Sequence, residues 1–256
     1  MKTFARTVSL VGIFLSLGGL VRAQQTKPSD GYDDAILNEL RAIRQSLDQL
    51  VILQSGAGPR VPAVARLTVS RDTLVLGRSD APLTMVEFVD LQCPYCRLYH
   101  ADTFKQIKEH WIDTGKLRYV VRDFPLEDVH PQAMNAARAV RCAGEQGKAW
   151  DLRERLLPLG SRLSPEIIRQ SAIDAGLKTE AFVGCSDSAK YDEPIRADIT
   201  EGQIVGITGT PSFVLGVTTV NGVEGTVVVG AMPYARFDAT LSDSLRTATN
   251  PSKPTR

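Results

Sequence analysis

Two cysteines separated by two residues are the part of this sequence best suited to chemistry. They stand in the motif Cys93-Pro94-Tyr95-Cys96, directly after an apolar run. A helix beginning here would place Cys93 at its N-terminus, where free backbone N–H groups and the helix dipole stabilise a thiolate. Pro94 suits the first helical position. Cys96 would lie one turn further on as a buried resolving thiol. We therefore expect thiol–disulfide exchange through a mixed disulfide at Cys93.

A metal site is the alternative interpretation of these cysteines. Cys93, Cys96 and His100 have a spacing that occurs in zinc sites. Cys142 or Cys185 would complete the ligand set. However, the chain has no second CxxC, and an apolar strand leading into the first cysteine is typical of redox motifs. We therefore favour exchange chemistry, expect neither metal nor cofactor, and expect His100 to face solvent.

An acidic residue precedes the motif within the same apolar run. Glu87 belongs to the segment Leu83–Val89, and strand alternation places its side chain on one face with Val89. A carboxylate beneath the thiol pair would have a raised pKa and could carry the proton of Cys96. The same pattern also fits a glutamate at a strand edge facing water.

The elements that must position these residues form a β-α-β unit. The apolar run at 83–89 predicts a buried strand, residues 97–113 a helix, and residues 117–122 the next strand. The other expected elements are strands at 67–70, 73–76, 212–215 and 226–229, a helical region from 131 to about 205, and a last helix over 234–245.

The N-terminus has the pattern of an export signal. Lys2 and Arg6 precede an apolar run over residues 8–21, and small residues allow cleavage after Ala23. The run is shorter than the ~20 apolar residues of a spanning helix, which argues against an anchor. We therefore expect a periplasmic mature protein whose cysteines meet an oxidising compartment. There, Cys142 and Cys185 favour a structural disulfide over two free thiols.

Residues 31–54 carry a heptad pattern. Its apolar seam consists of Leu40 and Leu47 at position a and Ile36, Ile43 and Leu50 at position d. Leucine at a with isoleucine at d disfavours two strands and favours three or four. A helix docked on its own domain is the alternative, but the Gly- and Pro-containing linker that follows favours homo-oligomerisation.

The composition of the chain limits the class of protein and the domain organisation that are possible. The chain has 256 residues, a formal charge of +1, and 43% hydrophobic residues, which is an ordinary globular composition. The near-neutral balance gives no electrostatic case for binding nucleic acid. The expected organisation is a signal peptide at 1–23, a coiled-coil-like helix and linker at 24–62, an α/β domain at 63–246, and a disordered tail at 247–256.

A series of short motifs runs through residues 67–246. They are Glu87 to Cys96, Arg122-Asp123-Phe124-Pro125-Leu126, His130-Pro131, Ala136-Ala137-Arg138-Ala139 with Cys142-Ala143 and Gln146-Gly147, and Gly209-Thr210-Pro211-Ser212-Phe213. In this order they resemble the DsbA-like thioredoxin-fold disulfide oxidoreductases of bacterial envelopes. The resemblance implies an α/β thioredoxin fold with a helical insertion, with Cys93 as nucleophile, Cys96 as resolving thiol and Glu87 as buried acid.

The resemblance also implies a substrate-binding surface. Pro211 would be cis and pack beside the disulfide, and Thr210 would offer its backbone to an extended substrate segment. Tyr95, between the two cysteines, would control access to them. Some family members are similar to this chain in carrying a second bridge, as Cys142 and Cys185 would form here.

These observations predict a periplasmic thiol–disulfide oxidoreductase that acts on exported cysteine-containing proteins and exchanges electrons with a membrane redox partner. The heptad segment favours an isomerase or reductase, because an oligomer holds several sites at high effective concentration around one substrate. Similar oligomeric members have an N-terminal helix before a CPYC domain. A monomer-type oxidase is the alternative, and an oligomeric chaperone or metal-binding scaffold is the alternative from another class.

Overall fold

The computed structural model describes only part of the chain. The described residues are 36–37, 39–40, 42–44, 46–47, 64–69 and 74–249. The expected signal peptide, the linker at 55–62, Leu50 of the heptad and the residues after 249 lie outside them. The described positions between 36 and 47 are helical, and their seam residues Ile36, Leu40, Ile43 and Leu47 are exposed.

A six-stranded sheet with the order β1-β6-β5-β3-β4-β2 forms the centre of the domain. Its strands are β1 (Ala65–Thr68), β2 (Leu74–Leu76), β3 (Leu83–Val89), β4 (Leu117–Asp123), β5 (Ser212–Thr218) and β6 (Gly222–Val229). β3 pairs in parallel with β4 and antiparallel with β5. Every residue of β3 is buried, as its apolar run predicts, because it has a strand on each side and helices on both faces.

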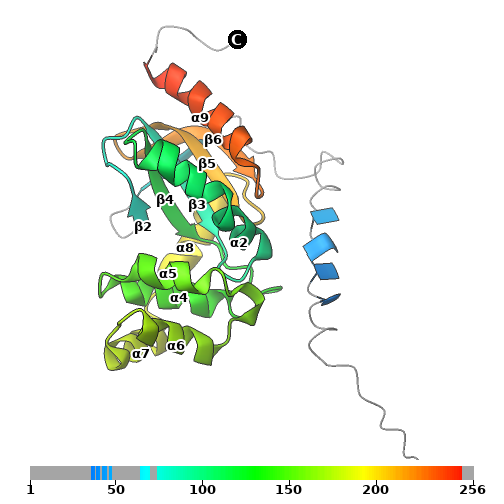
Figure 1. Ribbon diagram of the computed structural model, residues 1–256, viewed down its shortest axis with the longest axis vertical. Helices are drawn as coiled ribbons and strands as arrows, with labels where there is room; N and C mark the ends of the chain where they lie inside the picture. Colours follow the sequence, from blue (N-terminus) through cyan, green and yellow to red (C-terminus); the bar gives the residue numbers. More distant parts are fainter. Residues whose placement is uncertain are drawn as a thin grey trace, which may run out of the picture. The chain divides into compact units, whose positions relative to one another are not determined.

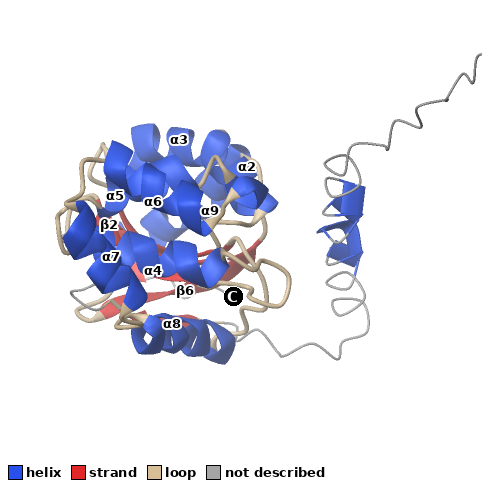
Figure 2. Ribbon diagram, turned by 90° about the horizontal axis from the view of Figure 1, so that it is seen from below, coloured by secondary structure: helices blue, strands red, loops and turns tan. Residues whose placement is uncertain are grey.

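The helices cover both faces of this sheet (Figures 1 and 2). They are α2 (Pro94–Ala101), α3 (Thr103–Ile107), the π-helix η1 (Lys108–Ile112), α4 (Ala133–Gly144), α5 (Ala149–Leu156), the 3₁₀ turn η2 (Gly160–Arg162), α6 (Pro165–Asp174), α7 (Thr179–Asp187), α8 (Asp192–Ile204) and α9 (Tyr234–Thr249). α2, α3 and α9 lie on one face and α8 on the other, while α4 to α7 group together as the helical insertion.

The alternation of β3 separates two hydrophobic cores. Met85 and Val89 point into the core beneath α2 and α9, while Val86 and Phe88 point into the core beneath α8. Gly202 permits the close approach of α8, since a Cβ there would lie only 2.9 Å from the Phe88 ring. The α/β thioredoxin fold with a helical insertion is thus confirmed.

The structure differs from the expected elements at several boundaries. The single helix predicted over 97–113 is broken at Asp102 (φ −126°, ψ −68°), so that α3 begins anew and ends in the π-helix. α9 continues to Thr249, past the expected domain end at 246, because Leu245 and Ala248 pack against the core.

The helical insertion is cross-linked. Cys142 of α4 and Cys185 of α7 form a disulfide with Cα atoms 5.8 Å apart and a sequence separation of 43. In the chain-entropy model, closing a loop of this length stabilises the folded state by about 4 kcal/mol.

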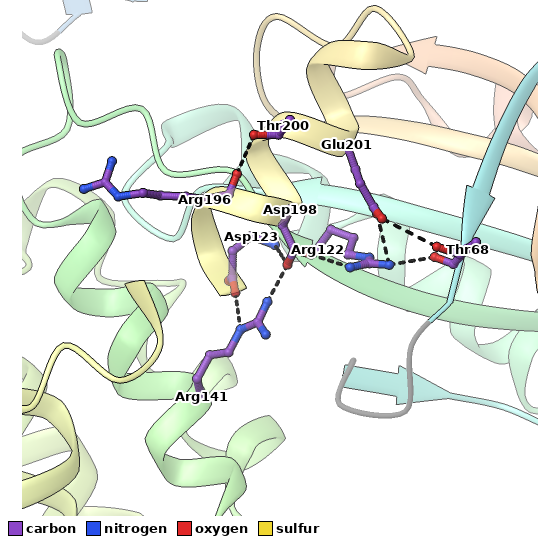
Figure 3. A network of polar contacts seen from close by, with 8 residues as sticks. All are labelled: Thr68, Arg122, Asp123, Arg141, Arg196, Asp198, Thr200 and Glu201. Atoms are coloured by element: carbon purple, nitrogen blue, oxygen red, sulfur yellow. Dashed lines mark hydrogen bonds and ion pairs between the residues drawn. The ribbon is translucent and has the colours of Figure 1, made fainter. Parts of the chain in front are cut away.

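A buried ionic network joins the insertion and α8 to the sheet (Figure 3). Asp198 of α8 is paired with Arg122 of β4 and Arg141 of α4, and it also accepts a hydrogen bond from the Asp123 backbone N–H. Arg141 donates to the Asp123 carboxylate at 2.6 Å. Asp198 is 1% exposed, so its charge depends on these partners for stability.

We predict that Asp198→Asn lowers the free energy of unfolding by about 3 kcal/mol, because it leaves the buried Arg122 and the partly buried Arg141 short of negative charge. Urea denaturation measures the change. Glu224→Gln is the matched control: it breaks the exposed Arg66–Glu224 pair and should cost less than about 1 kcal/mol. Equal effects of the two substitutions would contradict a structural role for the network.

Candidate active site

The cysteine pair lies where the central strand passes into a helix. Cys93 is the N-cap of α2, Pro94 is its first residue, and Cys96 lies one turn in. Cys93 is 2% exposed and Cys96 is completely buried, and the two thiols are not bonded to each other. The apolar β3 and the proline at the first helical position thus fix both sulfurs at one end of the sheet.

The surroundings of Cys93 favour its ionised form. Its pKa is lowered to about 7, chiefly by the hydrogen bond from the Cys96 thiol, with a further contribution from Thr210. Burial and the negative charge of Asp90 act in the opposite direction. When protonated, the Cys93 thiol donates to the Thr210 carbonyl at 3.4 Å. The buried Thr210 hydroxyl has no hydrogen-bond partner among the described residues.

The surroundings of Cys96 favour its protonated form instead. Burial, the neighbouring Cys93 sulfur and the charge of Glu87 all raise its pKa well above the usual value of a thiol. Near neutral pH, Cys93 is therefore the thiol that ionises, while Cys96 keeps its proton. Such an asymmetric pair can attack a disulfide through one sulfur and close through the other.

Glu87, on β3, has no exposed surface. Its Oε1 lies 2.7 Å from His100 Nε2, and its Oε2 accepts from Arg153 Nη2 at 2.7 Å. Burial alone would raise the pKa of Glu87, but the charges of His100 and Arg153 outweigh burial and lower it. The expectation of a raised pKa was therefore wrong, because Arg153 arrives from the insertion, far away in sequence.

His100 corrects a second expectation. Its side chain is only 8% exposed and faces Glu87, in contrast to the expected orientation towards solvent. His100 follows Cys96 by one helical turn, so the two share the face of α2 that packs on β3. That spacing is the signal in the sequence that places His100 against β3, although it also fits a zinc ligand.

The Thr210–Pro211 peptide is cis, and Pro211 lies directly before β5, next to the Thr210 carbonyl that the Cys93 thiol contacts. Ser212 Oγ donates to the Gly209 carbonyl at 2.7 Å, which fixes the loop just before the strand. Tyr95 is half-buried against the main core. The structure thus brings Tyr95, Thr210 and Pro211 to the same end of the sheet as Cys93.

A buried carboxylate that the sequence analysis did not single out holds the loop before the motif. Asp90 accepts from the backbone N–H groups of Gln92 at 2.7 Å and Leu126 at 2.9 Å, and pairs with His130 Nδ1 at 2.7 Å. Gln92 Oε1 accepts from the backbone N–H of Gln132. These bonds tie the motif loop to the segment after β4. His130, from the His130-Pro131 motif, is thus part of the site's support.

The zinc alternative lacks its fourth ligand. Cys142 and Cys185 are bonded to each other, and His100 is engaged with Glu87. Among the described residues, no group of three or more His, Cys, Asp or Glu side chains is arranged to hold a metal ion.

A low-pKa thiol, a high-pKa partner one turn away and a thioredoxin-like sheet together define a thiol–disulfide oxidoreductase. More specifically, the chain belongs to the thioredoxin family, whose model matches residues 69–232, and it is a DsbA-like member.

Solved structures agree with this assignment. α-DsbA1 of Wolbachia pipientis is 25% identical, with a TM-score of 0.65, and the match covers 73% of this chain and 98% of that one. Oxidised BdbD from Bacillus subtilis is 23% identical, with a TM-score of 0.62 and coverage of 72% and 98%. The catalytic domain of Proteus mirabilis ScsC is 19% identical, with a TM-score of 0.57 and coverage of 69% and 91%. The last two show the fold alone.

The similar curated proteins are much longer. The Na(+)/H(+) antiporter NhaA 3 of Salinispora tropica is 33% identical over 139 residues, which are 54% of this chain and 21% of the antiporter. NhaA of Herminiimonas arsenicoxydans is 31% identical over 172 residues, 67% of this chain and 25% of that protein. The chain therefore spans about a fifth to a quarter of these relatives. Within the described residues, none of the helices has the length and hydropathy to cross a bilayer.

We predict that alkylation of the reduced protein by iodoacetamide becomes half-maximal at about pH 7 and modifies Cys93 alone. Mass spectrometry of the labelled peptides measures rate and site. In Cys93→Ser, labelling at pH 7 should disappear because Cys96 keeps its proton. An inflection above pH 8 would contradict the lowered pKa of Cys93.

Proposed function

We propose that this protein is an exported periplasmic thiol–disulfide oxidoreductase that acts on cysteine-containing proteins, as an isomerase or reductase. The observation that carries the proposal is the opposite acidity of the two thiols. Cys93 has a pKa of about 7, and Cys96 has a pKa well above the usual value. Its partners would be exported client proteins and a membrane redox partner that keeps the pair reduced, with no nucleic acid and no cofactor.

The exchange reaction follows from this acidity difference. The Cys93 thiolate attacks a client disulfide, forming a mixed disulfide and releasing one client thiolate. A second client thiol then attacks the mixed disulfide, which rearranges the client, or Cys96 attacks it, which reduces the client. The client backbone would pair with Thr210 at the start of β5, beside Pro211. Tyr95 would limit which client segments reach the sulfurs.

The pKa of Cys93 also supports an isomerase or reductase over an oxidase. A very acidic nucleophilic thiol stabilises the reduced enzyme and makes it a strong oxidant, as in DsbA, where the pKa is about 3.5. Cys93, with its pKa at about 7, gives the reduced form much less stabilisation. The pair should therefore be a weaker oxidant, which suits an enzyme that must arrive reduced.

The N-terminal segment supports an oligomeric enzyme. Ile36, Leu40, Ile43 and Leu47 are each about half exposed, so the described part of the heptad seam is open to partner helices. An oligomer would hold several cysteine pairs around one client at high effective concentration. The signal-like pattern over 1–23 supports export to the periplasm.

We predict that Cys93→Ser abolishes reactivation of scrambled ribonuclease, since no thiolate remains to attack non-native disulfides. Cys96→Ser should instead accumulate mixed disulfides with the client, visible on non-reducing gels. If Cys93→Ser reactivates ribonuclease as well as the unaltered protein does, the enzyme proposal fails. Unchanged suppression of client aggregation in that variant would point to the chaperone alternative.

We also predict that deleting residues 24–55 lowers reactivation of scrambled ribonuclease at least about tenfold, because the loss of linked sites removes their effective concentration. Leu40→Asp with Leu47→Asp should act in the same way, and analytical ultracentrifugation should show monomers. Reduction of a small aromatic disulfide, which needs one site, serves as the control and should not change. No reactivation by the full protein, with rapid oxidation of reduced ribonuclease, would establish the oxidase alternative.

A further inference from the structure

Three ionisable side chains meet in the core beneath the cysteine pair, each from a different element. Glu87 comes from β3, His100 from α2 and Arg153 from the insertion helix α5. The Glu87 carboxylate contacts both of the others at 2.7 Å, and Arg153 Nη2 lies 2.8 Å from His100 Nε2. All three are nearly or completely buried.

The geometry around His100 Nε2 permits more than one position for a proton. A ring nitrogen carries either a hydrogen or a lone pair, whereas Arg153 can only donate. Nε2 can therefore donate to Glu87 or accept from Arg153, but it cannot do both. His100 Nε2 can therefore exist either with a proton, bonded to Glu87, or without one, bonded to Arg153.

The neighbouring groups leave His100 as the member of this cluster suited to changing its charge. The Arg153 guanidinium favours the ionised form of Glu87. The rings of Tyr99 and Phe104 lie 4.9 and 4.5 Å from the imidazole ring of His100. Burial raises the pKa of Tyr99, and that of its hydrogen-bonded neighbour Tyr119, well above neutrality, so both stay protonated.

We propose that His100 is a positioning residue that takes up the proton of Cys96 through Glu87 and returns it in the reverse step. The charge of Glu87 acts on the Cys96 thiol and raises its pKa. Because Arg153 stabilises the Glu87 carboxylate, Glu87 alone is a weak base. In this relay the proton moves on to the neutral imidazole of His100, whose slightly exposed ring can pass it to solvent.

This inference rests on the proposed exchange reaction, but it applies both when the protein reduces a client and when it oxidises one. In reduction, the Cys96 proton leaves and the thiolate attacks Cys93 in the mixed disulfide. The Cys93–Cys96 bond forms, the bond from Cys93 to the client breaks, and the client thiolate takes the electron pair. In oxidation, a client thiolate attacks Cys93, the Cys93–Cys96 bond breaks, and the Cys96 thiolate takes a proton back.

The test uses the full reduced protein and one equivalent of Ellman's reagent in stopped flow. A first phase releases one thionitrobenzoate as Cys93 attacks, and a second phase releases another as Cys96 closes the disulfide. We expect His100→Gln to slow the second phase about tenfold at pH 7, with the first phase unchanged within about twofold. The effect is smaller than that of a direct general base because His100 acts through Glu87.

The pH profile separates a proton role from a structural one. In the unaltered protein the second phase should be nearly independent of pH around neutrality and fall as His100 becomes protonated. Burial lowers the pKa of His100, so this fall should lie below about pH 6.5. In His100→Gln the rate should instead rise about tenfold per pH unit, since only hydroxide then removes the Cys96 proton.

His110→Gln is the matched control, because His110 is an exposed histidine on the π-helix and should leave both phases unchanged. A second phase in His100→Gln with the rate and pH profile of the unaltered protein would overturn the inference. Failure of the first phase in the unaltered protein would instead overturn the proposed function. If His100→Gln does not fold, NMR titration of His100 in the unaltered protein decides, since its pKa must differ between the oxidised and reduced forms. Identical values would refute the relay.

Discussion

The Glu87 carboxylate sits on the central strand with no exposed surface, and an ion in that position costs several kcal/mol unless it is paired. Its partners come from two directions: His100 from the helix that carries the cysteines, and Arg153 from the insertion. Arg153 can reach Glu87 only if α5 is docked against the face of β3 that lies under the thiols. The buried charge of Glu87 therefore links the docking of the insertion to the proton chemistry of Cys96. A change in the position of α5 would also change the pKa of Cys96.

The second ionic network performs a related task at β4. Asp198 brings α8 and α4 together through Arg122 and Arg141. The insertion is thus held to the sheet at two ionic anchors, and the Cys142–Cys185 bridge limits movement within it. Rigid docking of this kind matters because a shift of α5 would separate Arg153 from Glu87, while the contact of Glu87 with His100 of α2 would remain. The loss of Arg153 would change the charge balance around Glu87, which acts on the pKa of Cys96.

Local patterns predicted much of this molecule. The apolar run of β3, the proline after Cys93 and the spacing to Cys96 specify a strand, a helix start and a buried thiol, because each depends on neighbours along the chain. The boundaries of α3 and α9 depended on tertiary packing and were predicted less well. The partners of Glu87 were missed for the same reason. Arg153 lies far from Glu87 in sequence, and nothing in its local pattern indicates a buried arginine.

Asp90 shows why the cysteine motif alone does not determine the acidity of its first thiol. Its negative charge raises the pKa of Cys93, which opposes formation of the thiolate. Yet its carboxylate also holds the motif loop to the segment after β4, through the backbone N–H of Leu126 and the ring of His130. Burial alone would lower the pKa of His130, but the hydrogen bond and charge of Asp90, with that of Cys93, raise it. When protonated, His130 neutralises part of the charge of Asp90. Asp90 thus stabilises the motif loop but disfavours the Cys93 thiolate. The pKa of Cys93 therefore depends on residues from several segments that only the fold brings together.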